Sequence, residues 1–86
     1  MKMSLYSVNL TLRATRDSIR SLEDNLKWTE SSVMGEVSQI HEPAADKCME
    51  EMELFKVTVQ SAIEDLKHIE QILEEHKGFI EMMNNG

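Results

Sequence analysis

The amino-acid sequence predicts an all-α protein, an antiparallel hairpin of two long helices that pairs into a four-helix bundle. Three observations favour this fold. Apolar residues recur at steps of three and four in both halves of the chain, one proline interrupts them near the middle, and aromatic residues make up only 5% of the 86 residues. Apolar residues spaced 3.5 positions apart on average lie along one stripe of a helix, and that stripe has to pack against another helix.

The longest regular pattern predicts a helix over about residues 43–82. We expect its stripe to form the contact between the two helices, which we call the seam. Every member is apolar apart from His76: the stripe consists of Ala45, Cys48, Met52, Phe55, Val59, Ala62, Leu66, Ile69, Leu73, His76, Ile80 and Met83. The last residues, 84–86, are expected to fray.

The same spacing predicts a first helix over about residues 5–40, with Ser4 or Ser7 as its N-cap. We assign Leu5 to heptad position a and Val8 to position d. The stripe comprises Leu5, Val8, Leu12, Thr15, Ile19, Leu22, Leu26, Thr29, Val33, Val37 and Ile40.

Pro43 places the turn between the helices at about residues 41–43. Proline cannot continue a helix but fits the first turn of a new one, because its missing N–H would have no partner there. Gly35 weakens the end of the first helix and predicts fraying or a kink. A turn this short forces two long helices to fold back antiparallel as a single domain, residues 1–86.

A second face of the first helix carries no charge. Its c positions are Ser7, Ala14, Ser21, Trp28 and Gly35, and its g positions are Ser4, Thr11, Ser18, Asn25, Ser32 and Gln39. A solvated helix face normally carries Lys and Glu, and small residues let another backbone approach closely. The second helix also has apolar residues on both flanks of its stripe. We therefore predict a partner-binding surface formed by Thr11, Ala14, Ser18, Ser21, Trp28, Ile63, Ile72 and Phe79.

Charge and composition exclude several functional classes. The net charge of −7, which lies entirely in residues 41–86, argues against binding to nucleic acid and to anionic membranes. Cys48 is the one cysteine, so no intramolecular disulfide can form. Residues 1–7 do not read as a signal peptide, and no segment approaches the ~20 apolar residues of a membrane span. We expect a cytoplasmic protein, with any export by a route that needs no signal peptide.

Sequence motifs for catalysis are absent, and we expect no enzyme activity. The chain has no Gly-rich phosphate loop, nucleophile elbow or paired metal-binding cysteines. Glu64 and Asp65 lie one turn before His68, a spacing that can bind a metal, but such pairs are common in acidic helices. We predict no catalytic, cofactor-binding or metal-binding residues, no cofactor and no small-molecule substrate.

The layout resembles that of the WXG family, small helical hairpins without signal peptides that are exported by type VII secretion systems, and their relatives associated with polymorphic toxins. The resemblance lies in the length, the turn at residues 41–43 and the long second helix. It implies pairing, as a homodimer or with another helical protein, into a four-helix bundle. The W-x-G tripeptide is absent from the turn, since Trp28 and Gly35 stand apart, and Tyr6 is the one tyrosine, so the C-terminal export signature is missing. This pattern favours a toxin-associated partner or chaperone over an exported substrate.

Two other functions fit the same sequence. One is an acidic helical chaperone of type III secretion, which holds another helical subunit. The other is a structural coiled-coil subunit of a larger cytoplasmic or phage assembly. All three are non-enzymatic and act by helix pairing, with a second copy of the chain or another helical protein as the partner.

Overall fold

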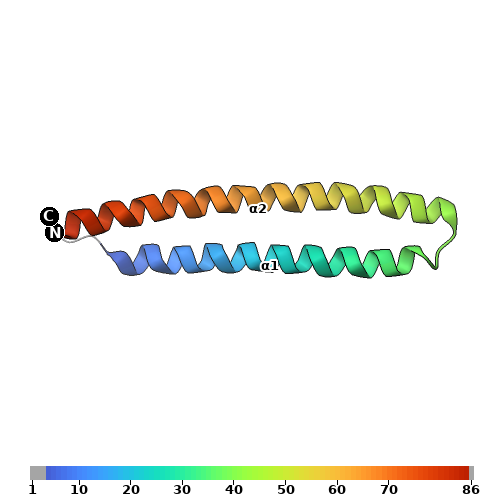
Figure 1. Cartoon of the computed structure of the whole chain (residues 1–86), viewed down its shortest axis with the longest axis horizontal. Coiled ribbons are helices and arrows are strands. Elements are labelled where there is room, and N and C mark those ends of the chain that lie inside the picture. Colours follow the sequence, from blue (N-terminus) through green and yellow to red (C-terminus); the bar gives the residue numbers. More distant parts are fainter. Residues whose placement is uncertain (1–3, 86) are drawn as a thin grey trace.

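The computed structural model describes residues 4–85 and contains two antiparallel α-helices joined by a short turn (Figure 1). Helix α1 is Leu5–Val37 and helix α2 is Glu42–Asn85. The hairpin measures 66 × 15 × 11 Å, and the start of α1 and the end of α2 lie at the end opposite the turn. The predicted helical hairpin is thus confirmed. Residues 1–3, part of the segment considered as a signal peptide, and Gly86, part of the tail expected to fray, lie outside the described residues.

The turn begins earlier than predicted, because α1 ends at Val37 rather than at Ile40. Two hydrogen bonds close its last turn: the Ser38 hydroxyl donates to the Gly35 carbonyl (2.9 Å), and the Gln39 N–H donates to the Glu36 carbonyl (2.8 Å). These bonds satisfy carbonyl groups that lack a partner further along the helix. Gly35 itself remains helical, so the fraying expected at this residue is not seen.

The start of α2 follows the sequence prediction. Pro43 lies in its first turn, and the N–H groups of Ala44 and Ala45 both donate to the His41 carbonyl (3.1 and 3.0 Å). The acidic Glu42 stands at the helix N-terminus, where the helix dipole favours negative charge.

The outer ends of the helices differ in part from the prediction. At the start of α1, Ser4 occupies the N-cap position, but its side chain makes no capping hydrogen bond. At the end of α2, the helix runs past Met82 to Asn85, so the predicted fraying of Asn84 and Asn85 was wrong. Asn84 is half-buried, which is unlike a side chain on a frayed end.

The seam on α1 is the predicted one. Val8, Leu12, Thr15 and Ile19 are buried, and the a and d residues that follow them up to Val33 are half-buried. The buried hydroxyl of Thr15 donates to the Thr11 carbonyl (2.8 Å), so it carries no unsatisfied hydrogen-bonding group. The best-packed part of the seam lies near the chain ends, where Val8, Leu12 and Ile80 form a cluster.

The seam on α2 differs from the predicted one by a rotation of the helix. Residues seven apart form lines along a helix, and three such lines matter here. The shared line, at the seam as predicted, is Ala45, Met52, Val59, Leu66, Leu73 and Ile80. The inner line, which is also buried or half-buried, is Met49, Lys56, Ile63, Glu70, Lys77 and Asn84. The outer line, predicted to be at the seam, is Cys48, Phe55, Ala62, Ile69, His76 and Met83.

The outer line is largely exposed, so four of the twelve residues predicted for the seam on α2 were wrong. Cys48 and Ala62 are half-buried, whereas the exposed fractions of Phe55, Ile69 and Met83 lie between 41% and 55%, and His76 is also exposed. Both flanks of the shared line carry apolar residues, so the heptad spacing alone does not decide which flank packs inward. The inner line packs inward here, where Ile63 enters the seam and Glu70 reaches an arginine of α1.

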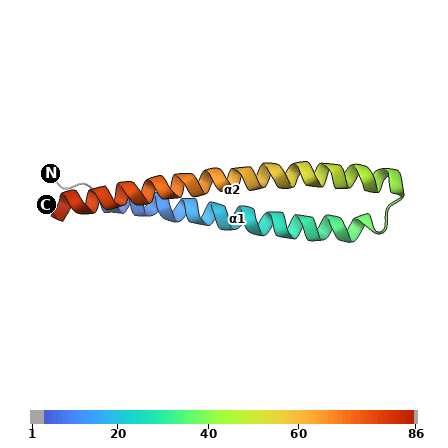
Figure 2. The ribbon, with the colours of Figure 1, turned by 45° about the horizontal axis from the view of Figure 1, so that its top comes forward.

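The hairpin exposes much more surface than a compact protein of its size. Its accessible surface is 6633 Å², whereas a compact monomer of 9.9 kDa has about 5,200 Å². Figure 2 shows the two helices overlapping near the chain ends and separating toward the turn, as expected for a pair that crosses at a shallow angle. A single pair of helices has little depth, and each helix therefore leaves one side uncovered.

Candidate partner-binding face

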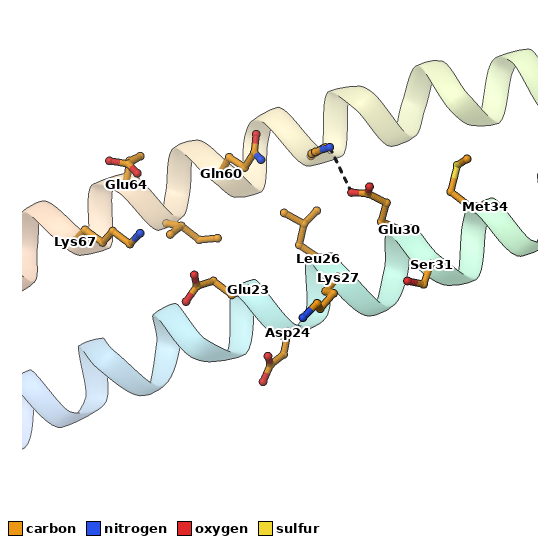
Figure 3. Close-up of a pocket in the computed structure, with 12 residues that line it drawn as sticks. Glu23, Asp24, Leu26, Lys27, Glu30, Ser31, Met34, Gln60, Glu64 and Lys67 are labelled. Carbon is orange, nitrogen blue, oxygen red and sulfur yellow. Dashed lines mark ion pairs between the residues drawn. The ribbon is translucent and has the colours of Figure 1, made fainter.

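One long side of the hairpin is charged and is closed by ion pairs between the helices. The Arg16 guanidinium pairs with two carboxylates of α2, through Nε to Glu70 Oε2 (2.7 Å) and through Nη2 to Glu74. Further along the same side, Lys56 Nζ lies 3.6 Å from Glu30 Oε2 (Figure 3). These side chains are partly exposed, and ion pairs that are open to water contribute little to stability.

A shallow groove of about 1050 Å³ runs between the helices on this charged side (Figure 3). Leu26, Met34 and Ile63 contribute its apolar part, and most of the other lining residues carry charge of one sign or the other. They are Glu23, Asp24, Lys27, Glu30, Lys56, Glu64 and Lys67. This mixture of opposite charges is what a solvated side of a helix pair normally carries.

The Arg16 ion pairs give a prediction about salt. The hydrogen bond to Glu70 raises the pKa of the Arg16 guanidinium, partly opposed by desolvation, so this group stays positive at all physiological pH values. Replacing Arg16 by Gln should therefore lower the free energy of unfolding slightly at low salt and by almost nothing at high salt. Urea denaturation at two salt concentrations measures the difference.

The matched control for this prediction is Arg13→Gln, because Arg13 makes no ion pair within residues 4–85. An equal loss of stability in both variants would show that the pairs of Arg16 do not stabilise the hairpin.

The opposite long side carries very little charge. A small hollow there is lined by Ser4, Ser7 and Thr11 of α1 and by His76 of α2, with Val8, Leu73 and Ile80 at the seam below. The g positions of α1 and the outer line of α2 therefore border the same side of the hairpin. The next line of α2 on this side is Ala44, Glu51, Thr58, Asp65, Ile72 and Phe79. We call the low-charge face the c and g positions of α1 together with these two lines of α2; Glu51 and Asp65 are its charged residues.

Seven of the eight residues predicted to bind a partner lie on the low-charge face and are exposed. They are Thr11, Ala14, Ser18, Ser21 and Trp28 of α1, and Ile72 and Phe79 of α2. Ile63 is a correction. It belongs to the inner line, packs at the seam, and is only 7% exposed, so it is not free to bind a partner in the hairpin.

The sequence analysis missed three apolar residues of this face, namely Phe55, Ile69 and Met83. Their heptad spacing placed them at the predicted seam, and the structure exposes them instead. Together with Ile72, His76 and Phe79, they continue the heptad spacing along the exposed side of α2, most densely over residues 69–83. α2 therefore carries a second apolar stripe, which a lone hairpin leaves open to water.

Other kinds of site find no support in the described part of the chain. Over residues 4–85, no three or more His, Cys, Asp and Glu side chains are grouped so that they could hold a metal ion. Neither described helix has a stretch that is both long and apolar enough to cross a membrane. Cys48 is a free, half-buried thiol.

Comparisons of the chain with protein-family models, with curated proteins and with solved structures found no match. The functional argument therefore depends on the hairpin and its low-charge face.

Proposed function

We propose that this chain is a non-enzymatic helix-pairing protein that binds another helical protein through its low-charge face. The main observation behind the proposal is which line of α2 packs against α1 and which line stays exposed. The hairpin buries the inner line, which contains Lys56, Glu70 and Lys77, and exposes the outer line, which contains no charged residue. A helix that has only one partner gains most by burying its more apolar line. An exposed apolar line therefore points to a second partner.

The size of the exposed stripe supports the same proposal. Phe55, Ile69, Ile72, Phe79 and Met83 are all at least 41% exposed and lie on one side of one helix. Burying the remaining apolar area of each gains about 1 kcal/mol, so together they supply several kcal/mol to an association. Scattered apolar residues on a surface have no particular meaning, but a contiguous stripe of this kind marks an interaction site.

We further propose a secretion-system setting, in which the chain is a WXG-like partner or chaperone of a toxin-associated helical protein. The hairpin layout and the absence of enzymatic motifs support this setting. It predicts that a gene next to this one encodes a protein with a long helical domain and that the two proteins purify together as a stable complex. If the neighbouring proteins do not bind the chain, the secretion setting is wrong. Helix pairing is tested separately, by the two variants described next.

The experiment for helix pairing compares Ile72→Arg with Leu54→Arg. Both residues are on α2 and are equally exposed, at 63% and 62%, but Leu54 lies outside the low-charge face. We expect assembly, measured by light scattering as a mass above 9.9 kDa or by co-purification with the helical partner, to be lost in Ile72→Arg and kept in Leu54→Arg.

Two outcomes would contradict helix pairing. One is an equal loss of assembly in both variants. The other is a wild-type chain that remains a monomer, melts at high temperature and binds no helical partner, since such a hairpin would need no second contact.

A further inference from the structure

We propose that the low-charge face binds a second copy of this chain, with the two-fold axis along the length of the hairpin. Both turns then lie at one end of the dimer and all chain ends at the other. This inference rests on the proposed function, since it identifies the partner of the same face. It depends on a match in side-chain size between α1 and α2, and that match follows from the register of the two helices.

The register is fixed by contacts along the seam. Near the chain ends, Val8 and Leu12 pack with Ile80. Further along, Arg16 reaches Glu70 and Glu74. Toward the turn, Glu30 is level with Lys56. Between these points, residues of the two helices can be assigned to the same level along the hairpin.

Near the chain ends, the low-charge face is small on α1 and large on α2. The α1 residues at this level are Thr11, Ala14 and Ser18. The α2 residues at the same level include the exposed Ile72 and Phe79. One half of the face is therefore a shallow strip, and the half beside it is a ridge.

Toward the turn, the larger side chains of the face first lie on α1 and then again on α2. The large Trp28 of α1 is level with Thr58 and Ala62 of α2, which are small. Beyond it, Ser32 of α1 is small where Phe55 of α2 is large and exposed. The two halves of the face are therefore complementary in size at three successive levels.

A two-fold axis along the hairpin uses this complementarity directly. Such an axis places α1 of one copy on α2 of the other and leaves the level of every residue unchanged. The ridge at residues 72–79 then meets the strip at residues 11–18, and Trp28 meets Ala62, twice in each dimer. A two-fold interface is made of the same patch from both copies, so a self-complementary patch is what it requires.

The end-over-end arrangement, with the axis across the hairpin, fits the same face poorly. It places α2 on α2 with the levels reversed about the middle of the helix. Asp65 lies close to that middle, so the Asp65 carboxylates of both copies would meet, and Glu51 would oppose Phe79. Like charges brought together at an interface are destabilising, and so is a carboxylate buried against an aromatic ring.

Charge and area also favour a second copy. With a net charge of −7, two copies repel each other over most of their surface, and this face is where the acidic residues are sparse. Its outline, taken from the 66 and 15 Å dimensions, is roughly 1,000 Å² per copy, above the ~800 Å² per partner of a standard interface.

Distances between spin labels test the arrangement. A cysteine is placed at Gln39, in the turn, on a Cys48→Ser background that retains the dimer mass. Labels at the two turns of one dimer should lie within the width of a four-helix bundle, ~20 Å plus the label arms. In an end-over-end dimer, they would lie close to the 66 Å length of the hairpin apart.

Two further labels make the measurement secure. A label at Asp24, near the middle and on the charged side, should give a distance close to the bundle width in either arrangement and shows that the labelled chains pair. A label at Asp46, exposed near the turn and outside the low-charge face, should repeat the short distance of the Gln39 label.

Each outcome decides the proposal. A dimer with short distances at Gln39 and Asp46 supports it. A dimer with distances near the hairpin length overturns the proposed axis, and a chain that stays monomeric at all concentrations overturns self-pairing. In both of those cases, the proposed function survives if Ile72→Arg still abolishes binding to the end-over-end copy or to a different helical partner, and fails if Ile72→Arg changes nothing.

Discussion

Replacing Leu12 by Asp should unfold the hairpin. Leu12 is only 1% exposed and lies at the centre of the best-packed cluster, between Val8 and Ile80. The substitution removes apolar burial and places a carboxylate among the apolar side chains of this cluster, at a cost of more than ~4 kcal/mol. Only six apolar side chains are buried in residues 4–85, so little stability remains to absorb this loss. Circular dichroism should show that the helical signal is lost at room temperature.

The control for this substitution is Leu10→Asp. Leu10 is two residues away on the same helix, but it is 46% exposed and points away from the seam. This variant has the same charge and nearly the same effect on helix propensity, so it should stay folded. Unfolding of both variants would mean that the added charge, rather than its burial, destabilises the chain.

Replacing Ser18 by Arg should abolish assembly and leave the hairpin folded. Ser18 is exposed at a g position of α1, so a long side chain meets no steric obstacle in the free hairpin. In an assembly, the arginine would be buried against the partner. The c and g positions of α1 hold no acidic residue that could pair with it. Overpacking and burial of an unpaired charge together cost at least ~2–3 kcal/mol, which weakens association by about 100-fold.

The control for assembly is Ser31→Arg, the same substitution at an exposed serine on the charged side of α1. Light scattering across a dilution series should show the assembly in Ser31→Arg and only monomers in Ser18→Arg. A dimer of unchanged strength in Ser18→Arg would show that the low-charge face is not the interface.

The sequence predicted α1 and the topology well, because their signals are local and unambiguous. The stripe through Leu12, Ile19 and Leu26 has one apolar side and two polar flanks, so the side that packs against α2 is unique. Pro43 placed the turn for an equally local reason, since no other residue of the chain both breaks a helix and fits the start of the next one.

The rotation of α2 could not be predicted, because α2 carries apolar residues on both flanks of its shared line. Periodicity shows that a stripe exists but does not show which partner covers it. The apolar spacing predicted that the flank with Phe55 and Ile69 packs against α1, because that flank is the more apolar one. In the structure, the flank with Ile63 and Glu70 packs there instead. The difference depends on contacts between helices, such as that from Arg16 to Glu70, which are far apart in sequence. The same error moved Ile63 to the predicted partner surface.

The position of the tightest cluster governs how this chain closes as it folds. In a helical hairpin, the contacts next to the turn ordinarily form first, because closing a short loop costs little entropy. Here Leu12 and Ile80 join nearly opposite ends of the sequence, and the segments beside the turn are only half-buried. The contacts that form first are therefore the weakest ones, and the gain comes only when the last turns of both helices meet. A hairpin built in this way is committed to its native state late, only after the residues around Ile80 have been synthesised.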